Sequence, residues 1–188
     1  MAGSDLAETV NRAIAGDRRA FDRLVQHYQA RISRYLLRLV HDEELALDLT
    51  QDTFVRAYRS LQTLRAAEHA GAWLYRIATN VAIQARGRGA RMQCQPWPEC
   101  DGEELGQTES PDRAVIDRDT VAEALRRLPH DRLVCLLLHV NEGFSYEEVA
   151  AIVNSTPEAV RKRVARAKQQ FRELYVAACE ENVHYAVR

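Results

Sequence analysis

The chain has 188 residues, of which 46% are hydrophobic and 28% are charged, and its formal net charge at pH 7 is −1. This composition can bury one core or two small ones, and it contains no apolar run near the roughly 20 residues of a membrane-spanning helix. The first residues, MAGSDLAETV, lack the pattern of a secretory signal, so we expect a cytoplasmic protein.

The cysteines and histidines do not predict a chemical centre. Four cysteines are too few and too scattered to predict a disulfide framework in a chain of this size. Cys94 and Cys100 flank a Pro-Trp-Pro run without CxxC spacing, which leaves a redox or metal role for them open. The six histidines share no spacing typical of metal ligands, and no nucleophile–base pair can be placed. We therefore expect neither an enzyme nor a cofactor.

Four helices are predicted in the first ninety residues. Residues 4–15 have apolar positions at helical spacing, with Gly16 placed to end that helix and Asp17 placed to cap the next. Residues 20–40 keep a 3.6-residue apolar period over five turns. A third helix follows and ends near Leu64. Its apolar positions are Leu45, Leu49, Phe54, Val55 and Tyr58, and its polar side carries Asp48, Gln51 and Asp52.

The fourth helix, residues 72–86, is expected after a loop from Leu64 to Gly71. Its buried face is expected to hold Trp73, Ile77 and Val81, with Arg76, Thr79, Asn80 and Gln84 available to a ligand. Residues 61–93 carry five arginines against one acid, which indicates a basic surface.

The amino-acid composition changes after Arg86, which indicates a linker. The stretch is rich in Gly, Pro and Gln and has no helical period, and residues 94–120 hold eight acids against two arginines. Helical periodicity returns beyond Asp112 and stops at Pro129. A very apolar helix is then predicted from Asp131, with Gly143 after its end.

Residues 145–172 predict a helix-turn-helix. Ser145 and Glu148 form a capping box for a short first helix, and Asn154 and Ser155 break it. Thr156 can cap the second helix, and Pro157 occupies the first helical position. The buried stripe of the second helix is expected to be Val160, Val164, Ala167, Phe171 and Leu174.

The other face of this second helix is basic. Residues 154–172 contain six positive side chains against Glu158 alone. A charge run by itself is often a solvated face, but the capped two-helix frame favours a helix in the major groove of DNA. Because no strand pattern of period two occurs, we expect an all-α fold of two small helical domains joined by a flexible acidic linker.

The order of several segments resembles the extracytoplasmic-function (ECF) sigma factors of bacterial RNA polymerase, in the sigma-70 family. The segments are GDRRAFDRLVQHY, DLTQDTFVRAY, AWLYRIATN, an acidic linker, LPHDRLVCLLLHVNEGFSYEEVAAIV and VRKRVARAK. The resemblance implies sigma region 2 in residues 1–90, a linker in residues 91–118 and sigma region 4 in residues 119–188. It implies a subunit that binds core RNA polymerase, recognises the −35 and −10 promoter elements and promotes DNA opening.

The resemblance also assigns site residues. DLTQDTF resembles the family's surface for the clamp helices of the largest polymerase subunit, although Leu49 and Phe54 are as readily core residues. The loop before the fourth helix and the helix itself resemble the part that captures a flipped base of the −10 element, where Trp73 is either a wedge in the opened duplex or a core residue. The residues implied for polymerase are Asp48, Leu49, Gln51, Asp52 and Phe54, and those for the −10 element are Arg65, His69, Trp73, Arg76 and Asn80.

For the −35 element the resemblance implies Glu158, Arg161, Lys162, Arg163 and Arg166. Lys162 departs from the small polar residue of the family pattern and adds a possible donor. Arg161, Lys162 and Arg166 are expected to point away from the buried stripe towards the groove, whereas Arg163 lies nearer the stripe and is expected to touch the DNA backbone.

Three further expectations follow from the family or compete with it. The acidic linker either threads the polymerase channel that RNA later occupies or is a solvated spacer. An anti-sigma factor is an expected partner. The rival function is a helix-turn-helix repressor or activator that binds duplex operator DNA without polymerase.

Overall fold

The computed structural model describes residues 3–89 and 118–186, and within them the side chains of residues 5–86 and 119–179. All elements in these residues are helical, which confirms the predicted all-α fold class. The described residues fall into two compact units, one containing α1–α4 and the other containing most of α5–α8. The predicted linker, including Cys94 and Cys100, lies outside the described residues except for Arg118.

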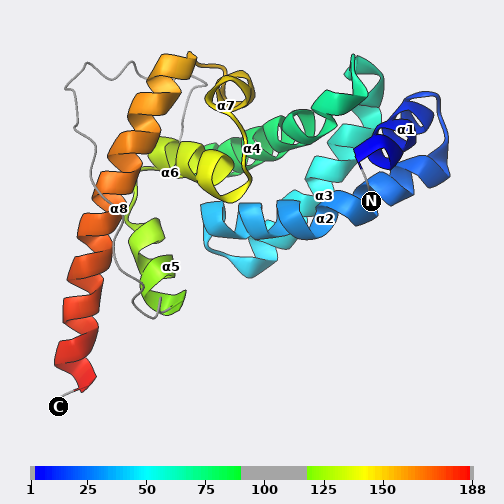
Figure 1. The fold of residues 1–188 in the computed structure, drawn as a ribbon. Coiled ribbons are helices and arrows are strands. Elements are labelled where there is room, and N and C mark those ends of the chain that lie inside the picture. The colour runs from blue at the N-terminus through cyan, green and yellow to red at the C-terminus, as the bar shows by residue number, and fades with distance from the viewer. Residues whose placement is uncertain (1–2, 90–117, 187–188) are drawn as a thin grey trace. The chain divides into compact units, whose positions relative to one another are not determined.

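The N-terminal unit contains four α-helices, shown from blue to green in Figure 1. They are α1 (Gly3–Ile14), α2 (Arg18–Val40), α3 (Glu43–Ser60) and α4 (Ala70–Gly89). Two short 3₁₀ turns, η1 (Leu61–Thr63) and η2 (Ala67–His69), connect α3 to α4. Because η2 runs directly into α4, this helix starts two residues earlier than predicted.

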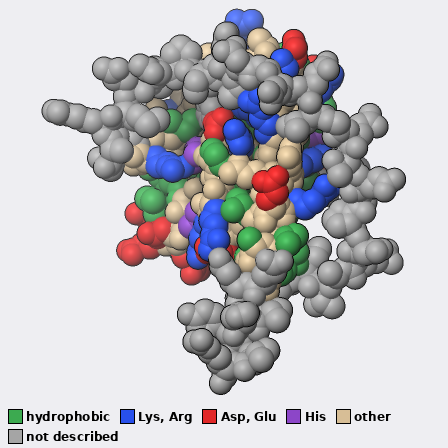
Figure 2. Space-filling view, turned by 90° about the vertical axis from the view of Figure 1, so that its left-hand side faces the viewer, with side chains coloured by type: hydrophobic (Ala, Val, Ile, Leu, Met, Phe, Trp, Pro, Cys, Tyr) green, Lys and Arg blue, Asp and Glu red, His purple; other side chains and the backbone are tan. Residues whose placement is uncertain are grey.

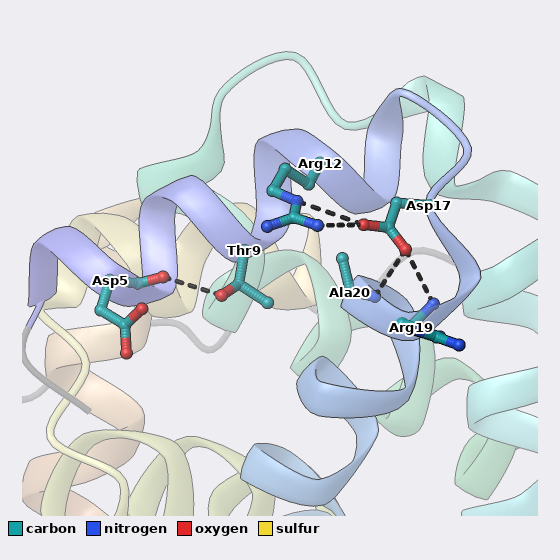
Figure 3. Close-up of polar contacts among 6 residues, drawn as sticks. All are labelled: Asp5, Thr9, Arg12, Asp17, Arg19 and Ala20. Atoms are coloured by element: carbon teal, nitrogen blue, oxygen red, sulfur yellow. Dashed lines mark hydrogen bonds and ion pairs between the residues drawn. The ribbon is translucent and has the colours of Figure 1, made fainter.

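The helix ends of this unit follow the sequence signals. Gly16 has a φ of 96°, a left-handed conformation that suits glycine after α1. The Asp17 carboxylate accepts hydrogen bonds from the backbone N–H groups of Arg19 and Ala20, and it pairs with the Arg12 guanidinium at 2.7 Å (Figure 3). This confirms Asp17 as the cap of α2.

A polar cluster lies inside the apolar core of this unit. Tyr35 and Tyr75 are fully buried, and their rings meet edge to face at 5.2 Å. The Thr79 hydroxyl donates to the Tyr75 carbonyl at 2.7 Å and lies 2.8 Å from the Tyr35 hydroxyl. Since the single Thr79 proton goes to the carbonyl, the Tyr35 hydroxyl is the donor to Thr79. Thr79 is therefore a buried structural residue, which corrects its prediction as a residue available to a ligand.

The C-terminal unit consists of α5 (Arg118–Arg126), α6 (His130–Leu136), α7 (Tyr146–Val153) and α8 (Pro157–Ala186). A π-helical turn, η3 (Leu137–Asn141), continues α6, and Gly143 follows it with a φ of 81°. Helix α8 packs against both α5 and α6. The interior holds Leu133, Val134, Leu138, Val149, Val160 and Val164. None of the described helices combines the length and apolarity needed to cross a lipid bilayer.

Candidate functional site

The turn between α7 and α8 has the predicted helix-turn-helix frame. The Ser145 hydroxyl accepts from the Glu148 N–H at 3.2 Å, and the Glu148 carboxylate accepts from the Ser145 N–H at 2.9 Å, which confirms the capping box. Asn154 ends α7 in the left-handed conformation, with a φ of 51°. The Thr156 hydroxyl accepts from the Ala159 N–H at 3.2 Å, as expected for the cap of α8.

The first turns of α8 separate buried from exposed positions. Val160, Val164 and Ala167 are buried, whereas Glu158, Arg161 and Lys162 are exposed and Arg166 is half-buried. The Lys162 ammonium pairs with the Glu158 carboxylate at 3.4 Å. We call Glu158, Arg161, Lys162 and Arg166 the α8 basic face.

Tyr146 of α7 supports the α8 basic face from the side. The Arg161 guanidinium carbon lies 5.4 Å from the centroid of the Tyr146 ring, a cation–π distance. The His139 ring stacks on Tyr146 at 4.2 Å, and its Nδ1 donates to the Phe144 carbonyl at 2.8 Å. Arg161 is thus exposed but rests on an aromatic platform that is itself fixed to η3.

Arg163 does not belong to the α8 basic face. It is 2% exposed, its Nη1 donates to the Ser155 hydroxyl at 2.9 Å, and its Nε lies 3.8 Å from the Asp131 carboxylate, longer than a hydrogen bond. A guanidinium enclosed in this way has no side to offer to a DNA phosphate. The structure corrects the predicted backbone contact, and Arg163 instead joins α8 to α6 and to the turn.

Helix α3 presents a second face, of different chemistry. Asp48 and Gln51 are exposed and Asp52 is half-buried, whereas Leu49 and Phe54 are 7% and 8% exposed and pack inside the unit. The Asp52 carboxylate pairs with Arg56 at 2.8 Å, and Arg56 also donates to Gln84 of α4 at 2.7 Å. Of the five residues predicted to bind polymerase, three are therefore accessible.

Exposed apolar residues on α3 were missed by the sequence reading. Leu47, Val55 and Tyr58 are 53%, 47% and 50% exposed. At about 100° of rotation per residue they fall within the same arc of the helix as Asp48, Gln51 and Asp52. Their spacing from Gln51 could have revealed them, but apolar type alone had assigned Val55 and Tyr58 to the apolar side. We call these six residues the α3 face.

The residues predicted for the −10 element divide between the surface and the interior. Arg65, His69, Arg76 and Asn80 are exposed, and the last two lie one turn apart on the same side of α4. Trp73 is 7% exposed and packs within the N-terminal unit, so the core interpretation holds for it.

Charge alone does not delimit these surfaces. Figure 2 shows Lys and Arg side chains at several places on one face of the molecule, with acidic and hydrophobic side chains between them. Within the described residues, no group of three or more His, Cys, Asp or Glu side chains could hold a metal ion. The assignments therefore depend on which side chains share one exposed helix face.

Comparison with protein families gives two matches. The family described as Sigma-70 region 2 matches residues 24–92, and Sigma-70, region 4 matches residues 118–171. Among curated proteins, the RNA polymerase sigma-H factor of Pseudomonas aeruginosa is 37% identical over 172 residues, covering 86% of this chain and 89% of that protein. The ECF RNA polymerase sigma-E factor of Escherichia coli K12 is 32% identical over 170 residues, covering 85% and 88%.

Solved structures give the same fold. CnrH in complex with the cytosolic domain of CnrY matches with a TM-score of 0.68 at 24% identity, covering 92% of this chain and 97% of that one. The sigma factor RpoE of Bartonella quintana, in complex with the anti-sigma factor NepR, matches with a TM-score of 0.63 at 25% identity, covering 82% and 95%.

Proposed function

This chain belongs to the ECF sigma factors of the sigma-70 family, and from that premise we propose how its exposed faces share the work of initiation. As a sigma factor, it acts with core RNA polymerase to direct transcription initiation at promoters. The rival function, a repressor or activator that binds operator DNA by itself, is not favoured by these relatives.

The division of labour follows from the chemistry of the faces. The α3 face combines carboxylates with exposed apolar side chains, a mixture suited to a protein interface. The α8 basic face carries three cations beside one acid, on the exposed side of a helix that a capped turn presents. We assign core polymerase to the α3 face and the −35 element to the α8 basic face. The observation that carries this assignment is the exposure of Arg161 and Lys162 beside buried Val160 and Val164.

For the −10 element, the proposal retains Arg65, His69, Arg76 and Asn80. An unpaired base and its flanking phosphates need donors on an open surface, and these four side chains are exposed. Trp73 is left out because its ring is buried. The corresponding domains are residues 1–90 for polymerase and the −10 element and residues 119–188 for the −35 element, with residues 91–118 as the linker.

The proposal also covers catalytic activity, location in the cell and a protein partner. The protein has no catalytic activity of its own, it works in the cytoplasm, and an anti-sigma factor is a partner, as in the complex of the Bartonella quintana relative. Purification from the native host, with identification of the proteins that bind, tests the last point.

Run-off transcription tests the function as a whole. The purified chain added to core polymerase should give a specific transcript from its promoter, and neither component should give one alone. Tight binding of the isolated chain to duplex DNA, with no effect of core polymerase on initiation, would instead identify the repressor or activator.

Charge reversal tests the division of labour. Arg161→Glu with Lys162→Glu should weaken discrimination of the −35 element by about thirtyfold or more, because two base contacts of roughly 1–3 kcal/mol each are lost. Binding to core polymerase should be unchanged. Arg126→Glu is the matched control, because Arg126 is an exposed arginine of α5, outside the α8 basic face.

The α3 face is tested by replacing an acidic residue with a basic one and measuring binding to core polymerase. Asp48→Lys should weaken co-purification with core polymerase by about tenfold or more, because a reversed charge faces the partner's complementary potential. Glu8→Lys on α1 is the control, since Glu8 is also exposed but lies off the α3 face. Equal co-purification of both variants would contradict the assignment.

A further inference from the structure

Helix α2 carries a line of cations that the assigned faces do not include. Six positions recur at spacings of four or three residues along its length. Each precedes a residue that is buried in the core, so all six lie along one edge of that buried face. We call them the α2 arginine stripe: Arg19, Arg23, His27, Arg31, Arg34 and Arg38.

The α2 arginine stripe is accessible to solvent, and it contains no acidic side chain. Arg19, Arg23 and Arg34 are exposed, and the other three side chains are partly exposed. Asp22, the one acid of α2, points more than a quarter-turn away from the centre of the stripe. Within the described residues, no acidic side chain pairs with Arg19, Arg23 or Arg34.

The charge of the stripe comes from its guanidinium groups. Partial burial and the neighbouring Arg31 lower the pKa of His27, so we do not count its imidazole among the charges of the stripe. Arginine remains charged at any pH at which the protein is folded. The stripe therefore carries five permanent positive charges.

The stripe has the composition of a phosphate-binding surface. A protein interface needs an apolar centre, and the α3 face has one in Leu47, Val55 and Tyr58. A single-stranded nucleic acid needs aromatic rings for base stacking, but Tyr28 and Tyr35 of α2 are buried. Leu37, 39% exposed, is a single apolar side chain near one end of the stripe and does not form an apolar centre. A line of guanidiniums with one such neighbour and no exposed aromatic ring fits the backbone of duplex DNA.

The dimensions are also suitable. From Arg19 to Arg38 the helix rises by 19 residue steps, which is about 28 Å at 1.5 Å per residue. Guanidinium groups four residues apart are separated by about 6 Å, within reach of successive phosphates.

We propose that the α2 arginine stripe is a further DNA-binding surface, which holds duplex promoter DNA by its phosphates independently of sequence. The inference rests on the proposed function, because it places the stripe inside an initiation complex. Its contribution is affinity, whereas the α8 basic face and α4 provide promoter recognition.

The salt dependence of promoter binding tests this proposal. Holoenzyme assembled from the full chain and core polymerase is titrated onto a labelled duplex promoter fragment at several KCl concentrations. The variant is Arg23→Gln with Arg34→Gln. Each lost phosphate contact should reduce the slope of log Kobs against log salt by about 0.9. Raising KCl from 50 to 200 mM should therefore weaken the parent holoenzyme about tenfold more than the variant.

Three controls separate the alternatives. Arg126→Gln with Arg127→Gln removes the same charge from two exposed arginines at the end of α5 and should leave the slope unchanged. Arg23→Lys with Arg34→Lys keeps the charge and should keep the slope. A fragment with scrambled promoter elements should lose the same increment in the Gln variant, since the contact does not depend on sequence.

The outcomes are distinct. An unchanged slope in the Gln variant overturns the proposal, as does an equal fall in the α5 control, which would indicate net charge alone. Weaker binding to core polymerase with an unchanged slope would identify an acidic protein partner instead. Failure of the proposed function would show as no specific transcript from the unmodified holoenzyme, whatever the variants do.

Discussion

The two units differ in the polar groups that they bury. The N-terminal unit buries neutral hydroxyls: Thr50 and Thr53 donate to carbonyls four residues earlier at 2.7 Å, and Tyr35 donates to Thr79. The C-terminal unit buries one threonine, Thr120, and in addition the charge of Arg163. A hydroxyl can be satisfied by its own helix, whereas a guanidinium with five donors must draw its partners from several segments.

This difference bears on how each unit fixes its functional helix. In the N-terminal unit, apolar packing and a buried hydrogen bond between two neutral groups, Tyr35 of α2 and Thr79 of α4, hold α4 in place. In the C-terminal unit, Arg163 joins α8 to Ser155 in the turn and to Asp131 on α6. The orientation of the α8 basic face therefore depends on a buried ion as well as on shape, and a defect at Arg163 should affect DNA recognition without any lost DNA contact.

The largest effect is expected from Arg163→Met. It removes the cation while Asp131 and Ser155 remain, and breaking a buried pair in this way costs a few kcal/mol. Because the Asp131 side chain is 26% exposed and can be partly solvated, we expect a loss of about 2 kcal/mol. Hydrogen exchange of α8 amides measures it.

Arg161→Met is the matched control, two residues away and exposed, and should change stability by less than about 0.5 kcal/mol. Replacing Asp131 with Asn in the Arg163→Met background should recover part of the loss. If Arg163→Met left the stability of the C-terminal unit unchanged or raised it, the buried charge would not stabilise this unit, and the contrast with the N-terminal unit would fail.

A smaller effect is expected from Tyr35→Phe in the N-terminal unit. The substitution removes one buried hydrogen bond, but the Thr79 hydroxyl keeps its bond to the Tyr75 carbonyl. The free energy of unfolding should fall by about 1 kcal/mol, read from hydrogen exchange of α4 amides. Tyr58→Phe, at a half-exposed ring, should have less effect. A loss equal to that of Arg163→Met would show that a neutral cluster can be as costly to break as an ion.

The smallest effect concerns Cys135, which reports on the C-terminal unit without altering it. Burial raises the pKa of its thiol to about 12, partly offset by nearby Arg163. A raised pKa keeps the thiol protonated through pH 8, so the native protein should not react with iodoacetamide at this position. Mass spectrometry of the Cys135 peptide should show labelling only as urea unfolds the unit.

In Arg163→Met, this labelling should begin at lower urea, while exchange of α4 amides in the N-terminal unit is unchanged. Rapid alkylation of Cys135 in the native parent protein would contradict its burial.

The fold and most of the site could be predicted because their signals are local. The capping box at Ser145 and Glu148 and the cap at Asp17 involve residues within three positions of each other. The fate of Arg163 could not be predicted, since Asp131 lies 32 residues earlier in the sequence and the pair forms only when α6 meets α8. Thr79 was missed for the same reason, because Tyr35 is 44 residues away.

Apolar type misled the prediction on α3 for another reason. Exposed apolar residues on a helix can recur at the same spacing as buried ones, so the spacing does not tell them apart. Only the packing of α3 against α2 and α4 decides which side of α3 faces inward. Val55 and Tyr58 were consequently assigned to the apolar side by residue type alone, although they lie beside the acids.

Helix α8 runs unbroken from Pro157 to Ala186, and this continuity constrains how promoter preference can evolve. An inserted residue would rotate every later side chain by about 100°, turning Val164 outward and a charged neighbour into the interior. Substitutions at Glu158, Arg161, Lys162 and Arg166, the proposed −35 contacts, leave this pattern of buried and exposed positions intact, whereas an insertion before Val164 would destroy it.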